Sequence, residues 1–310
     1  MASTSRVLDS QVFGEESAQG TVASTFAINL FGDVTNCSFV FDDKVQVVKG
    51  TTGGTSGHIS SKLIDLSNKT TGSLSFMPHD LRFLKYFLTG YAEAAGEYTM
   101  TNASTALPDS LTIKGTYDST HIVQVLGCYL NNLRLTLTTD EIVTGTADII
   151  GLYPSSATET ITYAPPSGDP LIFSGGVVTY NSKEWDIGNT TITLNPKFIQ
   201  KWSCKTIVAT KKRMPNEILR GGKFESSFNG KANINAIGDE LTEMWGGTAP
   251  ADTRSEVNLV LTFTSGSDTH VITIPGKTNK ATITESDAEE TAKELSFAGV
   301  GRNATVVGDL

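Results

Sequence analysis

Residues 133–137 read Leu133-Arg134-Leu135-Thr136-Leu137, an alternation of apolar and polar residues with a period of two. Because successive side chains of a strand point to opposite faces, this period predicts a strand with one buried and one exposed face. The stretch 257–263 follows the same pattern, with Val257, Leu259, Leu261 and Phe263 alternating with Asn258, Val260 and Thr262. The two stretches together predict a mainly β protein.

The composition supports this fold class. Threonine makes up about one residue in seven, and its β-branched side chain suits a pleated surface. Clusters of Gly, Asn, Asp and Ser separate the apolar stretches, as hairpin turns require. Further strands are predicted at Val45–Val48, Leu171–Val178, Thr190–Leu194, Thr206–Thr210, Val271–Ile274 and Lys293–Phe297.

One segment is typical of a short helix instead. Pro78-His79-Asp80 suits a helix start and Gly90 suits a stop, with large apolar residues between them. Because these residues cover most of the helix circumference, the helix either lies between two layers or packs against a partner subunit. The residues expected at that contact are Leu81, Leu84, Phe87 and Leu88. A weaker helix is predicted at 239–245.

The two halves of the chain resemble each other. The run from Asp118 to Gly127 is matched about 149 residues later by the run from Asp268 to Gly276. The predicted elements around each run follow the same order, and a final strand closes on a glycine at Gly151 or Gly299. Self-similarity at a fixed period predicts an internal duplication. In the second copy Pro275 replaces a leucine, which predicts a strand end or a sheet edge there.

The length of 310 residues agrees with about two domains. The boundaries expected from the repeat are an N-terminal segment at 1–35, a first module at 36–154 and a second module at 171–300. Between the modules lies a linker at 155–170, rich in Pro, Ser and Thr, and a C-terminal tail follows at 301–310.

Charge and cysteine usage narrow the class of protein. The formal net charge is -9, which argues against a protein that grips nucleic acid, because such affinity comes from clustered Lys and Arg. Cys37, Cys128 and Cys204 are widely spaced and indicate buried thiols in a reducing compartment. Residues 1–11 lack the apolar core of an export signal, and no window reaches the ~18 apolar residues of a spanning helix. We therefore expect neither export by that route nor a location in the membrane.

Patterns of catalytic or metal-binding residues are not found. His58, His79, His121 and His270 lack the spacing of a metal site. The run 299–304 matches G-x-G-x-x-A, but too few residues follow it for a nucleotide-binding unit. The expectation is a protein without enzyme activity, metal or cofactor.

Two strand pairs carry a resemblance to a known family. Gly127–Leu137, followed by Glu141–Gly151, resembles the closing strands of the tail tube (major tail) proteins of tailed bacteriophages. Gly188–Asn195 and Glu294–Gly299 are the similar pieces of the second half, and the resemblance covers about residues 36–300. It implies a duplicated tail-tube module, in which each copy is a small β-sandwich or barrel with one short flanking α-helix.

The resemblance also implies a function. Modules of this family assemble side by side into rings, and the rings stack into a tube through which the genome is ejected. A chain with two modules is therefore expected to form trimeric, pseudo-hexameric rings in the virion tail, after assembly in the host cytoplasm. The implied partners are further copies of the chain, the tape measure, tail terminator and baseplate or tip proteins, and double-stranded DNA that passes through the lumen without specific binding.

Two groups of residues are candidates for contacts between rings. The Gly- and Thr-rich run at 50–58 is either an ordinary surface loop or a stacking loop, and its candidates are Thr51, Thr52, Thr55, Ser56 and His58. A basic cluster is either a solvated loop or the contact for an acidic stretch of a neighbouring ring. The charges concerned are Lys211, Lys212 and Arg213 on one side and Glu285, Asp287, Glu289 and Glu290 on the other.

A carbohydrate-binding or adhesive β-sandwich is the competing prediction, because it shares Thr-rich strands and acidic charge. Such a protein needs a cluster of exposed aromatic residues on which sugars stack. Here many aromatic residues fall in the predicted helix, as Phe83, Tyr86 and Phe87 do, or at single strand positions. This distribution favours assembly over ligand binding.

Overall fold

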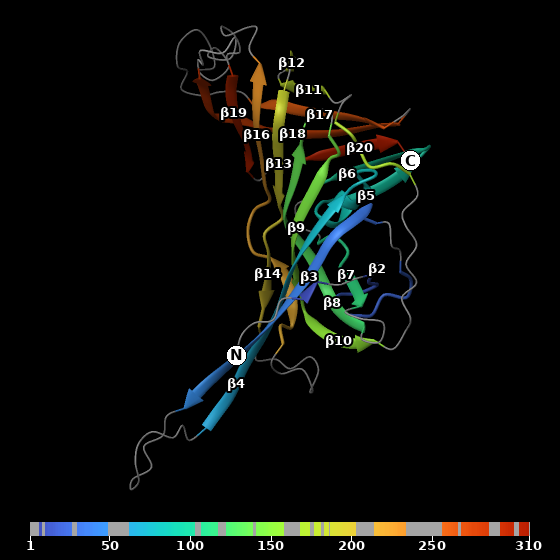
Figure 1. Cartoon of the computed structure of the whole chain (residues 1–310), viewed down its shortest axis with the longest axis vertical. Coiled ribbons are helices and arrows are strands. Elements are labelled where there is room, and N and C mark those ends of the chain that lie inside the picture. The colour runs from blue at the N-terminus through green and yellow to red at the C-terminus, as the bar shows by residue number, and fades with distance from the viewer. Residues whose placement is uncertain are drawn as a thin grey trace.

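The computed structural model describes residues 6–7, 10–26, 30–48, 62–102, 107–116, 122–138, 141–157, 168–173, 177–180, 183–185, 187–202, 214–233, 256–265, 268–284, 292–300 and 304–309. Within these residues the fold is mainly β, as the sequence predicts, and its strands pair antiparallel in curled sheets that are consistent with a β-sandwich or barrel (Figure 1).

The first half of the chain contains β1 (Arg6–Val7), β2 (Ser10–Glu15), β3 (Asp33–Val48), β4 (Lys62–Met77), the short helix η1 (Arg82–Tyr86), β5 (Thr89–Ala94), β6 (Glu97–Thr101), β7 (Leu111–Thr116), β8 (Ile122–Leu137), β9 (Thr144–Gly151) and β10 (Tyr153–Ala157). The second half contains β11 (Val177–Tyr180), β12 (Lys183–Trp185), β13 (Ile187–Asn195), β14 (Phe198–Lys201), β15 (Glu217–Arg220), β16 (Glu225–Asn233), β17 (Val257–Ser265), β18 (Asp268–Thr284), β19 (Ala292–Val300) and β20 (Thr305–Asp309).

A central sheet joins strands from both halves. Its order is β1-β3-β4-β9-β8-β13-β16-β19-β18. The two halves meet where β8 pairs with β13. At the other side of the first half, β3 and β4 continue past the remaining strands as a two-stranded arm (Figure 1).

Two flanking sheets cover one face of the central sheet. The first has the order β2-β7-β8-β10, and the second has the order β12-β11-β17-β18-β20-β6-β5. The long strands β8 and β18 each belong to two sheets, because the first part of the strand lies in a flanking sheet and the last part in the central sheet. In Figure 1 the strands β17, β18 and β20 cross the strands of the central sheet steeply.

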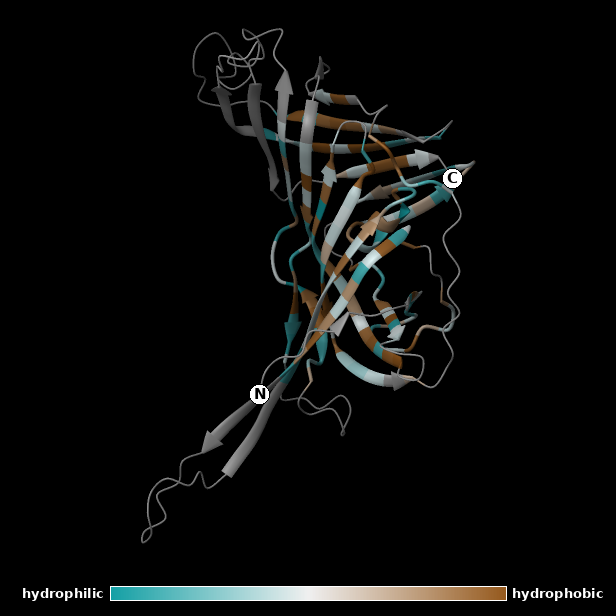
Figure 2. Cartoon of the chain, viewed as in Figure 1, coloured by the Kyte–Doolittle hydropathy of each residue, from teal (hydrophilic) through white to brown (hydrophobic). Residues whose placement is uncertain are grey.

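One hydrophobic core lies between the central and the flanking sheets, and it draws residues from both halves. The brown strand segments of Figure 2 converge on this region. Alternation with a period of two is confirmed in both diagnostic stretches: Leu133, Leu135 and Leu137 are buried while Arg134 is exposed. In the second stretch Leu259, Leu261 and Phe263 are buried, Val257 is half-buried and Asn258 is exposed.

Most of the other predicted strands are confirmed where they fall on described residues. The predictions at 45–48, 190–194, 271–274 and 293–297 lie in β3, β13, β18 and β19, and the one at 206–210 lies outside the described residues. The strand predicted at 171–178 is confirmed only in part. Its end lies in β11, residues 174–176 lie outside the described residues, and its start forms an isolated antiparallel bridge between Ile172 and Ile142. Leu171 and Phe173, on either side of this bridge, are buried, which explains their apolar character.

The predicted α-helix is also wrong in kind. Residues 82–86 form a single 3-10 turn, which starts after Leu81 without a side-chain cap from that residue. Phe83, Tyr86 and Phe87 are only moderate helix formers, and a helix of one or two turns is marginal on its own. The tight turn instead buries the bulky side chains together, and it ends where β5 begins at Thr89. The second predicted helix, at 239–245, lies outside the described residues.

Pro275 lies inside β18, opposite Asn258 of β17. On its other side β18 pairs with β20 up to Thr273 and with β19 from Lys277. Pro275 therefore falls in the gap between two neighbouring strands, where, among the described residues, β18 has a strand partner on one side only. The proline marks a local edge within a long strand.

Residues beyond the predicted module boundaries also take part in the sheets. In the N-terminal segment 1–35, β2 pairs with β7. In the predicted C-terminal tail 301–310, β20 pairs with both β18 and β6 and so links the two halves.

Candidate functional site

The ends of the central sheet are its most distinctive surfaces. At one end the outer side of β3 is paired only at Ser38 and Phe39 within the described chain, where β1 lies alongside. At the other end the segment 277–284 of β18 pairs with β19 and with no other strand among the described residues. Unpaired strand edges present rows of free N–H and C=O groups that can pair with another chain. The central sheet therefore has two edges suited to strand addition.

The junction between the halves shows how such edges pair in this fold. β8 and β13 lie antiparallel, with Leu133 opposite Leu194 and Leu137 opposite Thr190. The intervening pair Leu135 and Ile192 is fully buried against the core. One continuous sheet therefore runs through both halves.

The face of the central sheet that points away from the core is polar. One row of directly paired residues crosses five neighbouring pairs of strands: Asn36, Ser75, Thr146, Arg134, Thr193 and Ser227. These side chains are exposed or half-buried. Hydroxyl and amide groups dominate the row, and Arg134 is its one charged member.

The hairpin β14–β15 lies on this outer face, and no sequence pattern indicated its position. Phe198 and Ile218 of the hairpin form a small separate cluster with Tyr129 and Leu152 of the first half. The rings of Tyr129 and Phe198 lie 5.0 Å apart. The hairpin therefore attaches the second half of the chain to the outside of the first.

Asn131 is the main polar clamp of this contact. Its Nδ2 donates to the carbonyl of Phe198 and its Oδ1 accepts from the amide of the same residue, both at 2.8 Å. The side-chain amide thus takes the place of a neighbouring strand. Gln200 donates to the carbonyls of Thr70 and Gly151, and Gln19 exchanges two hydrogen bonds with the backbone of Ile218.

Glu16 organises the first half in a way that no local pattern indicated. Glu16 is 6 % exposed, and its carboxylate accepts hydrogen bonds from Gly20 N, Ser110 Oγ, Thr112 Oγ1 and Gly127 N at 2.7 to 2.8 Å. Gly127 lies at a φ of +63°, and a side chain there would collide with Leu152. Only the fold brings these partners together, because most of them lie far apart in the sequence.

The four residues predicted to pack as a helix are all inside the chain's own core. Leu81, Leu84, Phe87 and Leu88 have 0 to 1 % of their surface exposed. Around them Phe31 contacts the rings of Phe13, Phe76, Phe83 and Tyr86. The sequence predicted that this segment lies either between two layers of the fold or against a partner subunit. Within the described chain it lies between layers.

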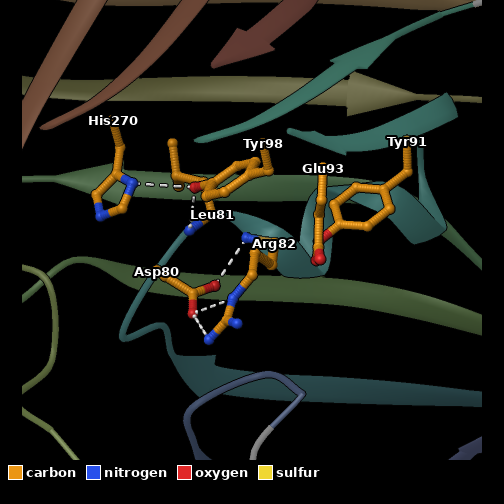
Figure 3. A network of polar contacts seen from close by, with 7 residues as sticks. All are labelled: Asp80, Leu81, Arg82, Tyr91, Glu93, Tyr98 and His270. Carbon is orange, nitrogen blue, oxygen red and sulfur yellow. Dashed lines mark hydrogen bonds and ion pairs between the residues drawn. The ribbon is translucent and has the colours of Figure 1, made fainter. Parts of the chain in front are cut away.

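A polar network connects η1 with the second half (Figure 3). The hydroxyl of Tyr98 accepts a hydrogen bond from the amide of Leu81 and lies 3.0 Å from Nδ1 of His270 on β18. His270 is buried, and burial raises the pKa of Tyr98. Asp80 accepts hydrogen bonds from the amide and the guanidinium of Arg82 at 2.7 Å, which raises the pKa of Arg82 despite partial burial.

A cavity of about 190 Å³ opens beside this network. It is lined by Leu30, Asp80, Arg82, Lys85, Tyr86, Tyr91 and Glu93. Its cations are neutralised within the chain: Lys85 pairs with Glu15 at 2.5 Å and Arg82 with Asp80 at 2.6 Å. The hydroxyl of Tyr91 bonds to Glu93, and burial together with this bond raises the pKa of Tyr91. Among the described residues the cavity therefore offers no unpaired cation, and the raised pKa of Tyr91 makes its hydroxyl a poor nucleophile.

The residues predicted to contact other rings fall on parts of the chain that the structure does not describe. Thr51, Thr52, Thr55, Ser56 and His58, the basic cluster Lys211, Lys212 and Arg213, and the acidic residues Glu285, Asp287, Glu289 and Glu290 lie outside the described residues. His121 and Cys204 lie outside them as well.

The two described thiols and His79 have surroundings typical of structural residues. Cys37 and Cys128 are free and buried, as predicted, and burial raises the pKa of Cys37 to about 12. His79 bonds to Asp33 through Nε2 at 3.0 Å. Within the described part of the chain no group of three or more His, Cys, Asp and Glu side chains is placed to hold a metal ion.

Comparison of the chain with protein-family models and with curated proteins gives no match. Among the described residues, none of the helices has the length and apolar character needed to span a membrane.

Proposed function

We propose that this chain is a structural protein of a virus tail, which forms trimeric, pseudo-hexameric rings that stack into the tube for genome ejection. The observation that carries the proposal is the arrangement of the central sheet. The sheet holds one strand set from each half, joined at β8–β13, and keeps a pairing edge at each end.

The strand pairings of the two halves support a duplicated module. In the first half the pairs are β2–β7, β7–β8, β8–β9, β9–β4, β4–β3 and β8–β10. The second half has the same set in the same order: β11–β17, β17–β18, β18–β19, β19–β16, β16–β13 and β18–β20. Six matched pairings in the same order are what a duplicated tail-tube module predicts.

Ring closure follows from the two edges. If β8–β13 joins two modules within a chain, then β18 of one chain and β3 of the next can join modules between chains in the same manner. Such a contact uses two different surfaces, so it closes into a ring when the rotation per module is a simple fraction of a turn. Three chains with two modules each supply the six modules that the resemblance implies.

The charge supports a conduit for DNA. The net charge of -9 repels phosphates, so DNA passes without the ion-pair contacts that would hold it. Tape measure, tail terminator and baseplate or tip proteins are the further partners of this proposal, and the virion tail is the location. The charges at 211–213 and 285–290 are its candidates for contacts between stacked rings.

A carbohydrate-binding or adhesive β-sandwich remains the competing proposal. Trp202 is the one aromatic residue among the large hydrophobic side chains that are exposed in the described residues. A single ring is a poor platform for sugar stacking. The surface features thus favour assembly.

The test combines light scattering during size-exclusion chromatography with negative-stain electron microscopy over a range of protein and salt concentrations. The expected species has a mass of roughly 99 kDa, three copies of the 33.1 kDa chain, and appears as rings or stacked tubes. A monomer under every condition contradicts the proposal. Binding of that monomer to a panel of immobilised glycans would support the competing one.

A further inference from the structure

We propose that β1 is a removable cover for the edge of β3, which blocks that edge in the single chain and leaves it when the β18 edge of a second copy pairs there. This inference rests on the proposed function, because it specifies the register and the control of the ring contact. It identifies the partner of the β3 edge as another copy of the same chain.

The position of β1 supports this role. β3 and β13 hold equivalent places in the two strand sets, since each pairs on one side with the next strand of its set, β4 or β16. On the other side β13 pairs with β8, while β3 pairs with β1. Both of these outer pairings are antiparallel. β1 therefore takes on β3 the place that a strand of the adjoining module takes on β13.

The strand registers locate the contact to the residue. Ile149 lies two residues before Gly151 and pairs with Gly72 of β4, which in turn pairs with Phe39 of β3. Phe297 lies two residues before Gly299 and pairs with Phe228 of β16, which in turn pairs with Ile192 of β13. Phe39 and Ile192 are thus equivalent positions.

The other side of the junction follows in the same way. Leu135 of β8 pairs with Gly145 of β9. Gly145 lies as many residues before Gly151 as Lys293 lies before Gly299. Lys293 pairs with Ile283 of β18, so Ile283 is equivalent to Leu135. Because Leu135 lies opposite Ile192 within the chain, Ile283 of one copy is placed opposite Phe39 of the next. β1 holds this same position in the single chain, with Arg6 opposite Phe39.

The lengths of the two pairings make the exchange favourable. β1 pairs at two positions, with Ser38 and Phe39, whereas the junction β8–β13 spans five, from Leu133–Leu194 to Leu137–Thr190. A longer strand that forms more ladder bonds displaces a shorter one from the same edge. Until then the short strand protects the edge against unspecific pairing.

Removal of the cover is the first test, with the full chain as reference. Deletion of residues 2–8 removes β1 and its pairing with β3. The change Val7→Pro disfavours the same pairing, because proline fixes φ and has no amide to donate. We expect ring assembly at a roughly fivefold lower protein concentration, which corresponds to the loss of about one net hydrogen bond from the competing pairing. Val7→Thr keeps a good strand former and should assemble like the unchanged chain. Circular dichroism and the melting temperature verify that each variant folds.

A cysteine pair tests the register independently. Val40→Cys and Thr282→Cys stand directly opposite each other in the inferred contact and should form disulfide-linked trimers on mild oxidation, since paired positions lie within disulfide range. Arg134→Cys with Thr193→Cys is the matched control, because these residues pair at the internal junction and should crosslink within one chain. Val40→Cys with Thr278→Cys is out of register and should not crosslink.

The outcomes separate the two proposals. Rings that assemble at the same concentration with and without β1, or that are lost when β1 is removed, overturn the role of β1 while the ring proposal stands. Rings of the Val40→Cys, Thr282→Cys variant that form without a crosslink between these two positions overturn the inferred register. If neither the unchanged chain nor the variants form rings, the proposed function fails and this inference fails with it.

Discussion

At the scale of single residues, the buried carboxylate of Glu16 shows how one side chain fixes several segments. It accepts bonds from two backbone amides and two hydroxyl groups, all of them in the first half. The change Glu16→Gln places an amide donor among these donors and leaves some of them unsatisfied. We expect a loss of about 2–3 kcal/mol in the free energy of unfolding, measured by urea denaturation. Glu97→Gln, the same change at an exposed position of β6, is the control, and an equal effect there would contradict the assignment.

Glu15, the neighbouring acid, predicts a pH dependence. Burial opposes its ionisation, but the hydrogen bonds from Lys85 and Tyr86 outweigh burial and lower its pKa. A lowered pKa means that the interaction stabilises the fold above the unfolded-state pKa and that the benefit disappears as the pH falls through the folded-state pKa. Because the pair is partly exposed, the change Glu15→Gln should cost less than about 1 kcal/mol at pH 7.

The pH series gives the decisive comparison for Glu15. The difference in unfolding free energy between the unchanged chain and Glu15→Gln should shrink as the pH falls through the folded-state pKa of Glu15, because below that pKa the acid is protonated in both states. Parallel urea titrations at several pH values measure it. A difference that stays constant, or that grows as the pH falls, contradicts the pairing.

At the scale of elements, the hairpin β14–β15 depends on one clamp. The change Asn131→Ala removes both hydrogen bonds to the backbone of Phe198 and leaves two buried backbone groups unpaired, so we expect a cost of about 1–3 kcal/mol. The loss should be local. Hydrogen exchange should rise at 198–201 and 217–220 while β17 and β18 stay protected.

The matched control for Asn131 is its neighbour. Asn132 is exposed and bonds to Asp148 on the sheet surface, so Asn132→Ala should leave exchange in the hairpin unchanged. If both variants release the hairpin equally, the docking depends on the local bend of β8 and not on the side-chain clamp.

Elements with a strong local pattern could be predicted from the sequence, and elements defined by distant contacts could not. The alternation at 133–137 and 257–263 directly reflects one buried face. By contrast, the chain turns into β14 at Lys197, which has a φ of +58°, and the hairpin gains its place from Asn131 and Tyr129. The 3-10 turn at 82–86 had the composition of a helix because burial in the core requires the same apolar residues that an internal helix would have.

At the scale of the whole molecule, the continuous core predicts cooperative unfolding of both halves. Leu135 and Ile272 belong to different halves but to one cluster of buried residues. Leu135→Ala and Ile272→Ala should each cost about 2–5 kcal/mol, and each should shift the same single transition in calorimetry. Two transitions, each sensitive to only one of the variants, would mean that the halves unfold separately.

The candidate site could be predicted from the sequence only as a class. Composition and alternation indicate a β protein suited to assembly, but the order of strands, and hence which edges stay open, depends on pairings between residues that lie far apart in the chain, such as Thr305 with Thr101. The charged runs near 211 and 287 could be predicted as candidates for contacts because the residue types themselves show the charge. Whether a strand edge is unpaired depends on backbone pairing, which the residue types of the strand do not reveal.

The β8–β13 junction lies within one polypeptide, and this has a kinetic consequence. Two edges on one chain meet at an effective concentration in the millimolar range, whereas edges on separate chains meet at the concentration of the protein in the cell. In the proposed ring, half of the lateral contacts thus never depend on dilution. The fused chain lowers the order of the assembly reaction, because three molecules must meet where separate modules would need six.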